Sequence, residues 1–240
     1  MLSPAKILDD LQASDPGRPR LTWYDDEPGP TQGERIELSA RVLANWVAKA
    51  ANLLQDDLAA EPGTTVGLDL PTHWRAAYWA LATWSVGATV VTGDEAIESD
   101  VLVTDDPTRA AAHGGDAVLV TLAALARSHP DAGMAPNAVD EARELSTHGD
   151  VFTPFADPEA GDVALVADGA STPYGALVTS QSPWGPRPRV AVAAPLPEAL
   201  TATLAAWCAD GSVVLSRGPA AGTAARHAAE GVTATYRAAH

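Results

Sequence analysis

Short runs of apolar residues alternate with longer amphipathic stretches along most of this chain. Continuous apolar runs, which are typical of buried strands in a parallel sheet, occupy residues 64–70, 88–92, 101–104, 117–120, 163–167, 190–193, 212–216 and 232–236. Helical patterns lie between them at residues 39–54, 71–87, 122–127, 197–209 and 220–230, and a further short helix begins at Asp106. We therefore expect an α/β protein with mostly parallel sheets flanked by helices.

The first forty residues follow a different pattern. A short amphipathic helix is expected over residues 4–13, followed by two strands at residues 21–24 and 35–38. The Pro- and Gly-rich run at residues 27–33 separates the two strands, and this arrangement predicts a hairpin. Ser39 then provides a suitable N-cap for the first long helix.

Residues 128–150 have little periodicity and are rich in Pro, Gly, Asn, Asp and His. Such a stretch is typical of a boundary or a surface excursion, with room for a helical turn at residues 138–145. We expect two β-α-β lobes over residues 1–150 and 151–240, unless the chain forms one continuous domain.

The 240 residues carry a formal net charge of −16. Nucleic acid and anionic membrane both attract cationic surfaces, so neither is an expected partner. The N-terminus lacks the pattern of a signal peptide, and no later segment approaches the length of a membrane span. The expected location is therefore the cytoplasm.

The stretch at residues 168–175, which reads D-G-A-S-T-P-Y-G, is the candidate site for chemistry. It lies between the apolar run 163–167 and a second run at residues 176–179, which is expected to form another strand. Small and hydroxylic residues between two buried strands let backbone N–H groups approach a phosphate. The sequence places no lysine there, because Lys6 and Lys49 are the only two lysines in the chain.

Other catalytic and metal-binding patterns are absent from the sequence. The six histidines are scattered without the spacing of metal ligands, and Cys208 lies in an apolar helical pattern as a small buried residue. Ser171 is preceded by the start of a nucleophile-elbow pattern, but Pro173 stands where the second glycine belongs. Arg187 and Arg189 could supply the missing positive charge, although surface positions in a connector are the simpler interpretation. We expect no catalytic and no metal-binding residue.

Four passages carry a resemblance to a known family. Residues 62–71 are similar to the pattern P-G-D-x-V-x-x-x-L-P, and residues 84–91 to A-x-x-x-G-A-x-x-V. Residues 189–216 look like the segment L-P-L-x-H-x-x-G through G-x-x-x-V-L, and residues 225–236 like E-x-x-V-T-x-x. In this order they resemble the N-terminal half of the AMP-binding, adenylate-forming enzymes, and a small uncharacterised actinobacterial family distantly similar to them.

The departures from that family matter as much as the matches. Its phosphate loop reads T-S-G-[ST]-T-G-x-P-K-G, and the matching positions here are Gly169, Ser171, Thr172 and Gly175. The middle glycine is replaced, the lysine is missing and Asp168 adds a carboxylate. The histidine expected after the next strand is also replaced, by the run P-L-P-E at residues 195–198. The family's adenine- and ribose-binding segments and its C-terminal lid, with the catalytic lysine, would follow residue 240.

The resemblance and these departures together imply a truncated, degenerate relative. We expect a non-catalytic protein that acts in protein interaction or regulation and uses no cofactor. Two alternatives stay open. One is a module that binds a nucleotide or acyl-adenylate, with ATP or AMP held at Gly169, Ser171, Thr172 and Gly175, without turnover. The other is half of a split adenylate-forming ligase. A truncated sheet would expose apolar surface, so a second copy or a dedicated protein partner is expected.

Overall fold

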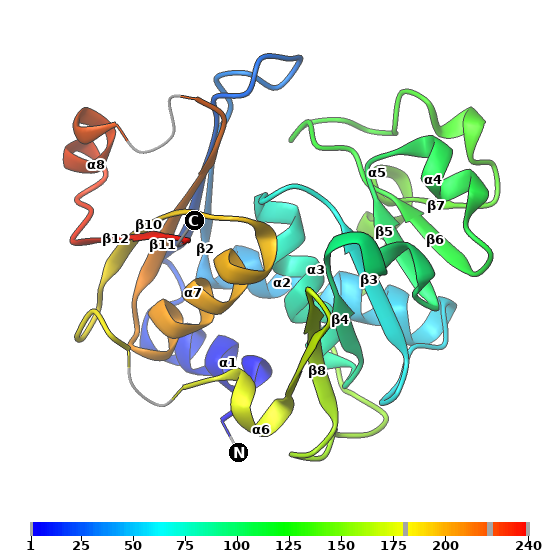
Figure 1. Ribbon diagram of the computed structural model, residues 1–240, viewed down its shortest axis with the longest axis horizontal. Coiled ribbons are helices and arrows are strands. Elements are labelled where there is room, and N and C mark those ends of the chain that lie inside the picture. Colours follow the sequence, from blue (N-terminus) through cyan, green and yellow to red (C-terminus); the bar gives the residue numbers. More distant parts are fainter. Residues whose placement is uncertain (1, 180–181, 220–222, 239–240) are drawn as a thin grey trace. The chain divides into compact units, whose positions relative to one another are not determined.

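A computed structural model describes residues 2–179, 182–219 and 223–238 of the protein, and the chain divides into two discontinuous compact units (Figure 1). Unit 1 comprises Met1–Ala44, Pro71–Ala77 and Val178–His240, and unit 2 comprises Asn45–Leu70 and Tyr78–Leu177. These units do not follow the expected division at residue 150. The reason is a long-range pairing, because a strand near the N-terminus belongs to the same sheet as strands near the C-terminus.

Unit 1 contains a five-stranded sheet with the order β12-β10-β11-β1-β2. Its strands are β1 (Pro19–Asp25), β2 (Arg35–Ser39), β10 (Arg189–Ala193), β11 (Ser212–Arg217) and β12 (Ala234–Arg237). The predicted hairpin is confirmed, since β1 and β2 pair antiparallel, while the remaining pairs are parallel. The helices are α1 (Pro4–Ser14), α7 (Leu196–Cys208) and α8 (Ala224–Ala229), and α7 packs against α1, β10 and β11.

Unit 2 contains a seven-stranded sheet with the order β7-β6-β5-β3-β4-β8-β9. Its strands are β3 (Thr65–Asp69), β4 (Thr89–Val91), β5 (Val101–Thr104), β6 (Asp116–Leu119), β7 (Val139–Asp140), β8 (Val163–Ala167) and β9 (Ala170–Pro173). Only β8 and β9 pair antiparallel. The expected α/β class with mostly parallel sheets is therefore confirmed.

Helical segments connect these strands. They are the π-helix η1 (Leu53–Asp57), the 3-10 helices η2 (Gly93–Glu98), η3 (Ala132–Met134) and η4 (Leu145–Thr147), and the α-helices α4 (Pro107–Ala112), α5 (Glu141–Glu144) and α6 (Tyr174–Leu177). Two longer helices, α2 (Ala40–Asn52) and α3 (Trp74–Ser85), each contain one of the boundaries between the units. The predicted long helices at residues 39–54 and 71–87 correspond to them, and η1 extends the first by one irregular turn.

Two predicted elements are wrong. Residues 122–127 form turns and irregular backbone instead of a helix, and the side chain of Leu125 is 95% exposed. A six-residue helix is unstable without packing, and this segment buries no apolar face. Residues 176–179 were expected as a strand, but α6 ends at Leu177. The first three residues of the predicted helix at 220–230 lie outside the described part of the chain.

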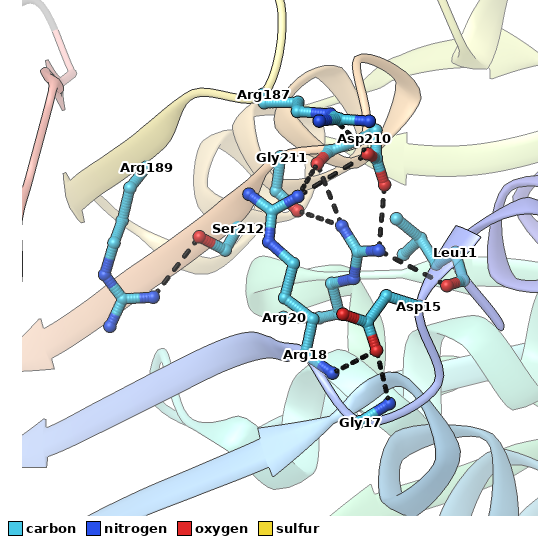
Figure 2. A network of polar contacts seen from close by, with 10 residues as sticks. All are labelled: Leu11, Asp15, Gly17, Arg18, Arg20, Arg187, Arg189, Asp210, Gly211 and Ser212. Carbon is cyan, nitrogen blue, oxygen red and sulfur yellow. Dashed lines mark hydrogen bonds and ion pairs between the residues drawn. The ribbon is translucent and has the colours of Figure 1, made fainter.

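A buried arginine connects the two ends of the chain within unit 1 (Figure 2). Arg20, at the start of β1, is completely buried. Its Nη1 donates to the carbonyl oxygens of Asp210 (2.8 Å) and Gly211 (3.2 Å), just before β11. Its Nη2 donates to the carbonyl oxygen of Leu11 at 3.3 Å and lies 2.8 Å from Asp210 Oδ1. One side chain thus fixes α1, β1 and the turn between α7 and β11.

Asp210 is shared by three arginines. Besides Arg20, Arg187 Nε lies 3.0 Å and Arg18 Nη1 3.5 Å from its Oδ2. Burial alone would raise the pKa of Asp210, but hydrogen bonds from Ser14 and Arg20 and the charges of the arginines outweigh burial and hold the pKa below its usual range. The Asp210 carboxylate is therefore the counter-charge for the buried guanidinium.

Replacing Asp210 by asparagine should destabilise the protein. Asparagine tolerates the left-handed backbone of this residue (φ 58°), so the substitution removes charge without adding backbone strain. The buried Arg20 guanidinium would then lack its carboxylate, and we expect the free energy of unfolding to fall by about 3 kcal/mol. Chemical denaturation at neutral pH measures this value.

Asp10→Asn is the matched control, because Asp10 forms an exposed ion pair with Lys6 and should contribute less than about 1 kcal/mol. A depressed carboxyl pKa stabilises the fold above the unfolded pKa, which is about 4, and this stabilisation is lost as the pH falls through the folded pKa. The difference between wild type and D210N should therefore shrink below about pH 4. If D210N and D10N lowered the free energy of unfolding equally at neutral pH, the role of Asp210 as the counter-charge of Arg20 would be contradicted.

Candidate functional site

The candidate loop is a tight hairpin in unit 2. Strands β8 and β9 pair from Ala167 and Ala170 outward, and only Asp168 and Gly169 form the turn between them. Both turn residues have positive φ angles, 51° for Asp168 and 73° for Gly169. Two successive left-handed residues are the signature of a type I′ turn, for which Asp-Gly is a preferred pair. The expected eight-residue loop is therefore a two-residue turn followed by a strand and a helical turn.

Side chains from the preceding helix and strand hold β8 in place. Trp84 Nε1 donates to the carbonyl oxygen of Ala164 at 2.8 Å, and Thr89 Oγ1 donates to that of Val163 at 2.7 Å. On the sheet, β8 lies parallel to β4, with Val90 opposite Leu165. These contacts all involve backbone groups of β8, so the strand is fixed independently of the turn that follows it.

Tyr174 anchors the other end of the hairpin. Its side chain is buried, and its hydroxyl donates to the carbonyl oxygen of Ala88 at 2.7 Å. Its backbone N–H donates to the carbonyl oxygen of Asp162 at 2.9 Å. Burial, together with the nearby charge of Asp162, raises the pKa of the phenol. A neutral, buried phenol of this kind has a packing role.

The four predicted ligand-binding residues lie in three different elements. Gly169 is in the turn, Ser171 and Thr172 are in β9, and Gly175 is in α6. Ser171 pairs with Val166 and Thr172 with Leu165, so the two neighbouring hydroxyl groups point to opposite faces of the sheet. The four residues do not form one continuous cradle of N–H groups, and their role in binding a nucleotide stays a prediction.

The charge around the turn is negative. The N–H of Gly169 donates to Glu95 Oε2 at 3.4 Å, so a carboxylate already occupies the position that an anion would take. Asp168 and Glu95 are both exposed. Glu95 lies in η2, 74 residues before Gly169 in the sequence, and no local pattern indicates that the two would meet.

The remaining candidates have structural partners within unit 1. Arg187 pairs with Asp210, and Arg189 donates to Thr22 Oγ1 at 3.0 Å and pairs with Glu230. Cys208 Sγ donates to the carbonyl oxygen of Thr179 at 3.3 Å, and burial raises the pKa of its thiol. Within residues 2–179, 182–219 and 223–238, no group of three or more His, Cys, Asp or Glu side chains is placed to hold a metal ion.

Among the described residues, no helix combines the length and the apolar character needed to cross a lipid bilayer.

Comparison with known proteins identifies one similar curated sequence. It is a TIGR03089 family protein of Mycobacterium tuberculosis, 37% identical over 163 residues, which cover 63% of this chain and 63% of that protein. The chain thus matches less than two thirds of its relative's length. No protein-family model matches the sequence.

Solved structures give broader coverage at lower identity. The Brucella canis acyl-CoA synthetase covers 98% of this chain with a TM-score of 0.74 and 17% identity, and the match spans 47% of that protein. Klebsiella oxytoca NpsA in complex with 3-hydroxyanthranilyl-AMSN matches with a TM-score of 0.65 and 15% identity, and the match covers 98% of this chain and 47% of that protein.

The N-terminal subdomain of the same NpsA, in complex with 3-hydroxybenzoyl-AMSN, matches with a TM-score of 0.67 and 14% identity over 98% of this chain and 59% of that structure. At such identities the likeness concerns the fold alone. The chain therefore has the fold of the N-terminal part of an adenylate-forming enzyme, as the sequence resemblance implied.

Proposed function

We propose that this chain is a non-catalytic protein with the fold of an adenylate-forming enzyme, and that it acts in protein interaction or regulation. The observation that carries the proposal is the hairpin turn of Asp168 and Gly169, whose glycine N–H is engaged by Glu95. This turn stands where the resemblance implies a phosphate-binding loop.

The length of the turn argues against a phosphate cradle. A phosphate group needs several backbone N–H groups converging on its oxygens. The glycine-rich pattern of adenylate-forming enzymes spans ten residues, whereas β8 and β9 are joined here by two. The residues that follow the turn are paired with β8 through Ser171 and Thr172. The backbone groups of this edge strand that face β8 are therefore committed to the sheet.

The charges at the turn also argue against a phosphate-binding loop. Two exposed carboxylates, those of Asp168 and Glu95, lie at the turn. At contact distance each would repel a phosphate by about 1–4 kcal/mol in the dielectric range between water and a protein surface. Adenylation instead requires positive charge that stabilises the pentavalent phosphorus and the departing pyrophosphate.

The cations considered as substitutes for the missing lysine do not offset this repulsion. No lysine follows Lys49, and Arg187 and Arg189 are paired with Asp210 and Glu230. Losing one oriented charge-stabilising donor typically costs catalysis about 2.7–4 kcal/mol. This supports a protein that keeps the framework of the fold without its chemistry.

We expect the purified protein to show no exchange of pyrophosphate into ATP with any member of a carboxylic-acid panel. We also expect millimolar ATP or AMP to leave the melting temperature unchanged, because a ligand held by the native state must raise it. The Brucella canis acyl-CoA synthetase, assayed in parallel, serves as the positive control. Isotope exchange and thermal melting are the two measurements.

The double variant Glu95→Gln, Asp168→Asn tests the electrostatic argument. Glutamine still accepts from Gly169, and asparagine tolerates the left-handed turn, so the hairpin should fold. If repulsion excludes the nucleotide, ATP should stabilise this variant more than the wild type.

Turnover by the wild type would overturn the proposal. Stabilisation without turnover would establish the nucleotide-binding alternative, and turnover that appears only with a second chain would establish the split ligase.

An interaction role also requires a surface for a partner. Two large apolar side chains in one segment of unit 2, Val151 and Phe155, are each 81% exposed. Their segment is held at its backbone, since Asn52 Nδ2 donates to the carbonyl oxygen of Val151 and Gln55 Oε1 accepts from Phe155 N. Fixed, exposed apolar side chains favour contact with a second copy or a dedicated partner.

We expect the wild type to self-associate in sedimentation equilibrium or to retain one specific protein in affinity capture. The variant Val151→Asp, Phe155→Asp should lose that association, because a charge replaces each apolar contact. Thr153→Asp adds a charge to the same segment without removing an apolar side chain, and it should retain most of the association. A strictly monomeric protein that captures nothing would contradict the interaction role.

A further inference from the structure

Unit 2 contains a cavity of about 330 Å³ that the hairpin does not contribute to. It lies among η2, β5 and α4, and it is lined by Asp94, Ile97, Leu102, Arg109, Ala112 and His113. Its size falls within the range of sites that hold small molecules, which are mostly apolar with a few placed polar groups.

Apolar side chains form the walls of the cavity. Leu102 is buried in β5, the strand between β3 and β6. Ile97 is 48% exposed although it is large and apolar, and Ala112 completes this surface at the end of α4. An isoleucine half exposed on a concave surface can gain further burial from the hydrocarbon part of a ligand.

The one guanidinium at the cavity already has two counter-charges. Arg109 Nη1 lies 2.5 Å from Asp69 Oδ1, and its Nε lies 3.7 Å from Asp106 Oδ2. It is therefore more than neutralised within its own surroundings. An anionic ligand would have to compete with both carboxylates for this arginine, so the cavity is a poor anion site.

Asp94 differs from those two carboxylates. It lies in the first turn of η2 and is exposed, and its carboxylate makes no hydrogen bond or ion pair with the described residues. Nearby, Nε2 of His113 is buried and likewise finds no hydrogen-bond partner in the described part of the chain. Because this nitrogen is closed off from solvent, the free acceptor that a ligand in the cavity can reach is the Asp94 carboxylate.

We propose that this cavity binds a small apolar amine. Its ammonium group pairs with the Asp94 carboxylate, and its hydrocarbon body packs on Ile97, Leu102 and Ala112. The negative charge of the protein, −16 overall, raises the local concentration of cations and so favours this ligand class. The inference stands apart from the proposed interaction role, because it uses neither the hairpin nor the segment with Val151 and Phe155.

Three probes that share one aromatic body and differ in charge test the proposal. They are phenethylamine, 2-phenylethanol and 3-phenylpropionate, titrated into the 240-residue protein and followed by ligand-observed NMR and calorimetry. We expect phenethylamine to bind about fivefold more tightly than the alcohol, which corresponds to one partly screened ion pair. The carboxylate should bind most weakly.

Asp94→Asn should reduce the affinity for phenethylamine to that for the alcohol and leave the alcohol unchanged. Glu98→Gln is the matched control, because Glu98 is an exposed carboxylate of the same 3-10 helix that does not line the cavity. It should keep the preference for the amine. Ala112→Phe, at an exposed position, should fill the cavity and abolish binding of all three probes.

Three results would overturn the proposal. They are the absence of binding by any probe, equal affinities for the three charges, and a loss of preference in E98Q as large as in D94N. The last result would mean that the amine responds to the general negative field of the protein. None of these outcomes bears on nucleotide turnover or on self-association, so the proposed function is tested separately.

Discussion

The pairing of Arg20 with Asp210 is the constraint on which unit 1 depends, because it joins residues 190 positions apart. Strand β1 lies between β2 and β11, and its side chains Leu21 and Trp23 are completely buried. A two-stranded hairpin alone is marginally stable in water. The N-terminal hairpin therefore reaches its stable environment only when residues 212–217 are available to pair with β1, after a large loop has been closed.

This long-range closure explains which parts of the fold the sequence predicts. The elements that a local sequence pattern predicts agree with the structure. Examples are β8 at residues 163–167, the hairpin of β1 and β2, and α7. The two compact units do not correspond to continuous ranges, because a pairing between β1 and β11 leaves no trace in local periodicity. The helix expected at residues 122–127 fails for a related reason. Its composition suits a helix, but none of its residues is fully buried and the segment buries no apolar face.

The candidate site shows the same division between local and distant information. The pair Asp168-Gly169 is itself a signal for a two-residue type I′ turn, and the resemblance to a longer glycine-rich loop favours a different interpretation of these residues. No pattern in the sequence predicts the contact of Gly169 with Glu95, because this contact depends on how η2 lies beside the hairpin. Charge at a turn is set by such distant neighbours as much as by the turn's own residues.

The framework and the turn can therefore change independently. Trp84, Thr89 and Tyr174 hold the hairpin through backbone carbonyl groups, so these bonds form whatever side chains occupy the turn. This separation is compatible with a chain whose fold matches the Brucella canis acyl-CoA synthetase over 98% of its length at 17% identity, while Asp168 and Glu95 place two carboxylates at the turn. The buried sheet constrains residue size and polarity. An exposed turn at the sheet's edge is under no such constraint, so loss of a charged site there does not require loss of the fold.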